Sequence, residues 1–208
     1  MSNLISISVG VLGFLPFLFV FWKRLKEDYS SSQIFESGFY IIFAIAFFVL
    51  VFAFGLSRFV PPSSIFSPAG LWFWGGVVGF VVGLGIAILR LNLKFFESFE
   101  AGSLGFLIWV AIVYLTDSIK NSSLASLIAF GASFYLVLLF FFLDHRYKKF
   151  TWYRSGKIGF SGLAVTGIFF LQRAVVALFF PFVLSFVGRI DALLSGAVSF
   201  ILFLLLYN

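Results

Sequence analysis

Long apolar runs, separated by short polar segments, dominate the sequence. The hydrocarbon core of a bilayer is about 30 Å thick, so a helix of about 20 apolar residues is long enough to cross it. Helix is expected because lipid offers no partner to unpaired backbone groups, and runs such as 41–54 lack the strict alternation of a membrane β-barrel. The pattern predicts an all-α polytopic bundle of about seven transmembrane spans, at residues 4–22, 38–56, 71–89, 101–116, 124–143, 158–186 and 192–207. The sixth is long enough to be tilted, or broken near Pro181.

Composition favours the same class of protein. Of the 208 residues, 62% are apolar and 11% are charged, whereas a soluble domain is about half apolar and a quarter charged. The predicted spans and their short loops use nearly the whole chain, so we expect one integral membrane domain over residues 1–208. The first residues lack the basic stretch of a signal peptide, and we interpret the first run as a retained span.

Basic residues predict the orientation. The loops that hold most Lys and Arg face the cytoplasm, and we therefore expect the N-terminus outside, the C-terminus in the cytoplasm and the chain in the cell (cytoplasmic) membrane. The net charge of +6 is better matched to anionic lipid headgroups than to nucleic acid. The basic side of the bundle holds Lys23, Arg24, Lys26, Arg90, Lys94, Arg146, Lys148, Lys149, Arg154 and Lys157; the opposite side holds Arg58, Lys120 and Arg189.

Several kinds of chemistry are excluded. The chain has no Cys and a single His, His145, so disulfides, thiolate nucleophiles, zinc–thiolate sites and multi-histidine metal sites are ruled out. No phosphate-binding loop or nucleophile elbow occurs. We expect neither a metal nor a cofactor.

A few polar or small residues within the spans are candidates for a site. Arg173 lies in an apolar stretch, where an ionisable group costs about 3 kcal/mol unless it faces protein, water or phosphate. It is a phosphate-binding group, a snorkelling side chain, or part of a short interruption of the helix near the bilayer edge. Gly75, Gly79 and Gly83 share one helix face and predict close helix packing; alternatively, Gly75 and Gly76 leave room for a lipid headgroup.

Two acids are weaker candidates. Glu100 lies deeper than Glu97 at the start of the fourth span, where acids suit the helix dipole. Asp117 belongs to a polar turn outside the membrane. Both are also compatible with a solvated helix end.

The order of these features resembles bacterial prolipoprotein diacylglyceryl transferase. Residues 71–79 are similar to the family's S-F-H-G-G-x-x-G span, residues 95–100 to its aromatic stretch ending in an acid, and residues 162–173 to its G-L-x-L-x-x-Y-G-x-x-R helix. The resemblance implies a seven-span fold and transfer of a diacylglyceryl group from phosphatidylglycerol to the lipobox cysteine of prelipoprotein signal peptides. It implies lipid contacts by Trp74, Gly75, Gly76, Tyr114 and Arg173, with Arg173, Glu100 and Asp117 as candidate catalytic residues.

The sequence departs from that family at important positions. Trp74 replaces the catalytic His, and an indole cannot act as a general base. Tyr114 replaces an Arg and lacks its charge for phosphate, and Asp117 replaces an Asn. Arg173 matches the late Arg only with a one-residue shift, since Gln172 is the ungapped match. Ser122 and Ala177 stand where the family has acids.

Three functions remain open at this point. The first is a divergent diacylglyceryl transferase that binds phosphatidylglycerol. The second is a lipid-binding or scaffold protein that keeps the fold without the chemistry. The third, which the sequence favours least, is a small membrane transporter, because only Gln172 and Arg173 lie clearly within a span.

Overall fold

The computed structural model describes residues 2–55, 68–147, 159–179 and 189–207. These residues form seven α-helices and one π-helical turn, and no strand occurs among them. The expected turn around Arg58 and the expected break near Pro181 lie outside the described residues. The helices are α1 (Ser2–Leu25), α2 (Ser31–Leu50), α3 (Pro68–Leu91), α4 (Phe95–Asn121), α5 (Leu124–Arg146), α6 (Phe160–Phe179) and α7 (Arg189–Tyr207), and the π-turn Val51–Gly55 extends α2.

Six of these helices, α2 to α7, are long and apolar enough to cross a membrane. Large apolar side chains cover their outward faces; on α2, for example, Phe35, Phe39, Phe43 and Phe47 all lie exposed. Such a surface is suited to acyl chains and not to water. The predicted helical membrane bundle is confirmed, and the protein is a multi-pass membrane protein.

The largest differences from the predicted helix starts are at α2, which begins seven residues earlier, and at α4, which begins six residues earlier. The second span, expected from residue 38, begins at Ser31, because Ser30 and Gln33 form a reciprocal capping box that satisfies the first backbone N–H groups. The fourth, expected at 101–116, extends over Phe95–Asn121. Its acidic first turn lowers the local hydropathy, but Glu97 and Glu100 are both buried within the bundle.

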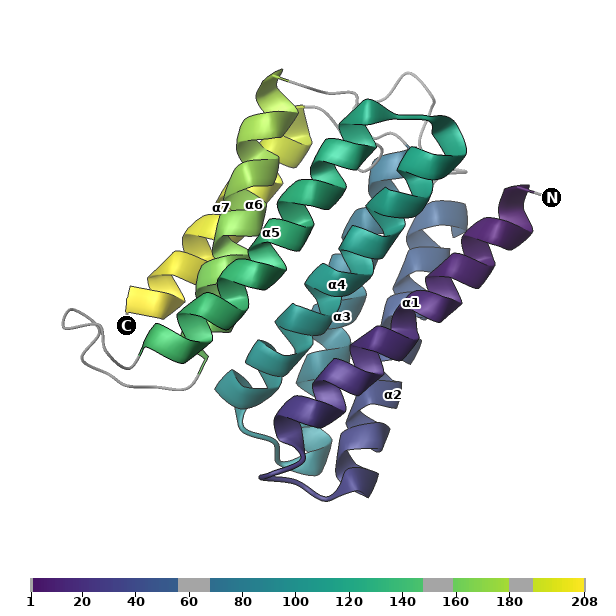
Figure 1. The fold of residues 1–208 in the computed structure, drawn as a ribbon. Helices are drawn as coiled ribbons and strands as arrows, with labels where there is room; N and C mark the ends of the chain where they lie inside the picture. The colour runs from purple at the N-terminus through teal and green to yellow at the C-terminus, as the bar shows by residue number, and fades with distance from the viewer. Residues whose placement is uncertain (1, 56–67, 148–158, 180–188, 208) are drawn as a thin grey trace.

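The helices are arranged around α4, the most deeply buried of the six candidate spans. It packs against α1, α5 and α6, while α2 pairs with α3 and α6 pairs with α7. Figure 1 shows that α1 starts and α7 finishes at opposite ends of the bundle. We call the end at which α4 and α6 finish the Arg173 end, and the end at which α4 begins the Glu100 end.

A glycine face on α3 holds it against α2. A Cβ added to Gly79 would lie 2.5 Å from the Ile45 Cα, and one added to Gly83 would lie 2.6 Å from the Ile41 Cα. Both neighbours are backbone atoms, so the two helices touch main chain to main chain. Small residues at this spacing permit that approach. This is the close helix packing that the sequence predicts for Gly79 and Gly83.

Candidate functional site

The side chain of Arg173 is buried near the C-terminal end of α6, with 4% of its surface exposed. Its Nη2 donates hydrogen bonds to both carboxylate oxygens of Asp191 on α7, at 2.9 and 3.0 Å. Its Nη1 donates to the Tyr114 hydroxyl on α4, at 2.9 Å. Three helices therefore meet at one guanidinium.

Two aromatic residues of α3 also belong to this group. The Arg173 Cζ lies 3.5 Å from the centroid of the Phe73 ring, a distance at which a cation is attracted to the ring face. The indole Nε1 of Trp74 donates to Asp191 Oδ1 at 2.8 Å. We call Phe73, Trp74, Tyr114, Arg173 and Asp191 the Arg173 cluster.

The cluster is electrically balanced. Asp191 is fully buried and forms an ion pair with Arg173, so one positive and one negative charge share an apolar surrounding. A buried ion of this kind is tolerated when it is paired and hydrogen-bonded. Arg173 is therefore accommodated within the span because its side chain faces protein groups.

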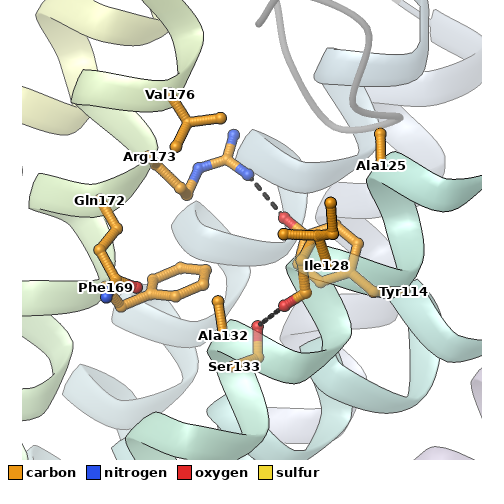
Figure 2. Close-up of a pocket in the computed structure, with 10 residues that line it drawn as sticks. Tyr114, Ala125, Ile128, Ala132, Ser133, Phe169, Gln172, Arg173 and Val176 are labelled. Carbon is orange, nitrogen blue, oxygen red and sulfur yellow. Dashed lines mark hydrogen bonds between the residues drawn. The ribbon is translucent and has the colours of Figure 1, made fainter.

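A groove of about 300 Å³ lies beside the cluster, between α4, α5 and α6. Arg173 and Tyr114 form its polar end, and Figure 2 shows the guanidinium pointing across it to the tyrosine hydroxyl. Ile128, which is well exposed, places the groove at the outer surface of the bundle. The lining residues are Tyr114, Ala125, Ile128, Ala129, Ala132, Ser133, Phe169, Gln172, Arg173 and Val176.

Small side chains on α5 create this groove. Ala125, Ala129 and Ala132 lie on the helix face turned toward α6, because residues three and four apart share a face. The Ser133 hydroxyl is turned back onto the Ala129 carbonyl at 2.9 Å, so it adds no polar group to the groove. Apart from its polar end, the groove therefore presents hydrocarbon.

The structure brings together three of the sequence-predicted residues, Trp74, Tyr114 and Arg173. Gly75 and Gly76 adjoin Trp74 but serve helix packing. A Cβ at Gly75 would lie 2.7 Å from the Phe48 carbonyl oxygen, and one at Gly76 would lie 3.5 Å from the Trp109 ring. Neither position leaves room for a lipid headgroup.

Asp117 lies one helical turn beyond Tyr114 and has a different role. Its carboxylate accepts hydrogen bonds from the Ser126 hydroxyl and from the Asn121 amide, the latter at 2.6 Å. Ser122 adopts a left-handed conformation (φ 49°) between the two helices, and Ser123 caps the start of α5. Asp117 therefore fixes the tight turn from α4 to α5 and contacts no residue of the Arg173 cluster through a described hydrogen bond.

Glu100 lies at the opposite end of α4. It is 14 residues before Tyr114, which corresponds to roughly 21 Å along a helix. Its carboxylate accepts hydrogen bonds from Arg24 on α1 at 3.3 Å and from the backbone N–H of Gly159 at 2.7 Å. Arg24 also pairs with Asp144 on α5 at 3.0 Å. Glu100 thus joins α1, α5 and the start of α6, away from the groove.

Glu97 and its neighbours add further polar contacts at the Glu100 end of the bundle. Lys94 Nζ donates to Glu97 at 2.9 Å, and the Tyr29 hydroxyl donates to the same carboxylate at 3.3 Å. The hydrogen bond from Lys94, together with the negative charge of Glu97, raises the pKa of Lys94. Lys94 therefore keeps its positive charge throughout the physiological range.

We expect Glu100→Gln to lower stability without changing what the groove binds. The substitution removes charge-assisted hydrogen bonds, each of which contributes about 1.5–3 kcal/mol, yet it lies about four helical turns from the groove. Thermal unfolding in detergent measures the first effect, and the amount of lipid retained by the folded protein measures the second. Loss of bound lipid from a variant that is still folded would instead assign Glu100 to the site.

Sequence analysis missed Asp191 and Phe73. Asp191 lies one residue before the expected start of the last span at 192, and the hydropathy pattern therefore leaves it outside that span. It is instead in the first turn of α7. An acid at a span boundary near an intramembrane arginine is a signal that could have identified it. Phe73 carries no such signal among the 34 phenylalanines of the chain.

The cluster offers little for acid–base chemistry. The indole of Trp74 donates a hydrogen bond and cannot accept a proton. The Asp191 carboxylate is already held by Arg173 and Trp74. Within the described ranges no group of three His, Cys, Asp or Glu residues could hold a metal ion.

Comparison with known proteins adds no relative: no family model, no curated protein and no solved structure matches this chain.

Proposed function

We propose that this protein binds a glycerolipid of the membrane in the groove between α4, α5 and α6. The observation that carries the proposal is the combination of an apolar groove at the outer surface with a polar end formed by Tyr114 and Arg173. Acyl chains would lie along the alanine face of α5. The ester and headgroup oxygens would meet the Tyr114 hydroxyl and the guanidinium. Ligand pockets commonly combine an apolar wall with a few polar groups in this way.

The proposal includes the topology expected from the sequence. Seven spans with the N-terminus outside and the C-terminus in the cytoplasm put the Arg173 end in the outer leaflet of the cell membrane. The lipid would then enter sideways from that leaflet. Reporter tags at each end of the chain test this topology, and a C-terminal tag reached only after the membrane is opened is the expected result.

The resemblance to prolipoprotein diacylglyceryl transferase makes phosphatidylglycerol the first lipid to test. Support comes from Trp74, Tyr114 and Arg173, which the resemblance assigns to one family site and which belong to one cluster although they lie on three different helices. Among the open functions, lipid binding without turnover is favoured over transfer, because no side chain of the cluster is in place to deprotonate a thiol.

We expect Ala132→Trp to abolish lipid retention. The indole would fill much of the groove, whereas Ala197→Trp, on the exposed face of α7, adds the same side chain away from it. Native mass spectrometry of protein purified in mild detergent measures bound lipid directly. The proposal requires a glycerolipid on the wild type and on Ala197→Trp, and at least tenfold less on Ala132→Trp. Equal retention by both variants would contradict it.

A separate assay tests the transferase. Purified protein is incubated with phosphatidylglycerol and a lipobox peptide, and peptide mass is followed for addition of a diacylglyceryl group. We expect no addition from protein that retains lipid. If Ala197→Trp adds the group to the peptide and Ala132→Trp does not, the protein is a transferase and not a binding protein without turnover.

A further inference from the structure

This inference rests on the proposed lipid groove and concerns which headgroup the groove selects. Among the described residues that line it, Arg173 is the one that carries a charge. A lone guanidinium would favour an anionic lipid, since phosphate accepts two parallel hydrogen bonds from it. Headgroup selectivity therefore depends on what else holds Arg173.

Asp191 neutralises Arg173 from α7, which contributes no residue to the described lining of the groove. Both of its oxygens accept from Arg173 Nη2, at 2.9 and 3.0 Å, so the carboxylate lies against one end of the guanidinium. The pair has no net charge, and its attraction for an anion a few ångströms away is largely cancelled by the repulsion from Asp191.

A phosphate cannot readily displace this carboxylate. Asp191 is fully buried and also accepts a hydrogen bond from Trp74 at 2.8 Å. If displaced, it would be an unpaired charge in an apolar surrounding, which is strongly unfavourable. The ion pair thus remains closed when a lipid enters.

We infer that Asp191 is an internal counter-ion that makes the headgroup end of the groove neutral, so that the groove takes lipids through their diacylglyceryl part without preference for an anionic headgroup. Phosphatidylglycerol and the zwitterionic phosphatidylethanolamine then bind about equally. Either lipid then meets the same neutral end of the groove, which does not distinguish a phosphate with net charge from one without.

The test measures lipid competition. Wild-type protein is equilibrated in mixed micelles or nanodiscs that contain equal amounts of the two lipids, and bound lipid is identified by native mass spectrometry. We expect a bound ratio near one. Asp191→Asn leaves the positive charge of Arg173 without a counter-ion and should shift that ratio about tenfold toward phosphatidylglycerol. A factor of about ten corresponds to one charge-assisted hydrogen bond. A wild type already enriched in phosphatidylglycerol, or a folded Asp191→Asn with an unchanged ratio, would overturn the inference.

A second variant keeps the test decisive if Asp191→Asn does not fold. Arg173→Met combined with Asp191→Leu removes both charges and should keep the wild-type ratio, because the site is neutral in both proteins. A fall in the phosphatidylglycerol share would show that Arg173 attracts the anion despite Asp191. Failure of the lipid groove itself has a different signature, namely equal lipid retention by Ala132→Trp and Ala197→Trp, whatever the ratio.

Discussion

Replacing Arg173 with methionine is expected to lower the free energy of unfolding by about 3–5 kcal/mol, the cost of leaving one member of a buried ion pair alone. Asp191 would remain fully buried with its negative charge uncompensated, and Tyr114 would lose its guanidinium partner. Thermal unfolding in a mild detergent, followed by tryptophan fluorescence, gives the measurement. A variant whose transition matches the wild type would show that the pair contributes nothing to the fold.

Two controls separate charge from size. Adding Asp191→Leu to Arg173→Met removes the uncompensated charge, and replacing a whole buried pair with apolar residues is often neutral or stabilising. The double variant should therefore regain most of the lost stability. Gln172→Met changes the adjacent residue, which is half-buried in the groove, and should stay within about 0.5 kcal/mol of the wild type.

The second large effect is expected from Gly79→Ala in the contact between α2 and α3. The new methyl group would meet the Ile45 Cα at 2.5 Å and the Ala44 carbonyl oxygen at 2.6 Å, and backbone atoms cannot move aside as a side-chain end can. The helices must separate, at a cost of about 1–3 kcal/mol. The same melting experiment measures it, together with the yield of monodisperse protein.

Gly85→Ala is the matched control, because it makes the same change on the same helix. A Cβ at Gly85 meets nothing within 4 Å, and alanine is the better helix former by up to about 1 kcal/mol. This variant should be neutral or slightly stabilising. Similar losses at both positions would mean that glycine acts through helix flexibility and not through the contact between helices.

The sequence predicted the helices well because hydropathy depends on each run by itself. It predicted their ends poorly where polar residues find partners elsewhere in the chain. Glu97 and Glu100 looked like the solvated edge of a span, yet Lys94, Arg24 and Gly159 satisfy them inside the bundle. A hydropathy window cannot register a partner on another helix.

The site was predictable in part for the same reason. An arginine within a span had to face protein, water or phosphate, and the resemblance linked it to Trp74 and Tyr114. Which of the three it faces depends on the packing of α6 against α7. Asp191 lies at the start of α7, and periodicity along one helix cannot show which residue of its neighbour it meets.

The ion pair between α6 and α7 also bears on how the chain is made. An arginine that leaves the translocon alone in a helix costs about 3 kcal/mol in lipid, and Asp191 follows Arg173 by only 18 residues. If both helices leave the translocon as one hairpin, the charges enter the bilayer already neutralised. Ribosome-bound chains that end before Asp191 should then hold α6 at the translocon, whereas chains that extend through α7 should release the pair into lipid together.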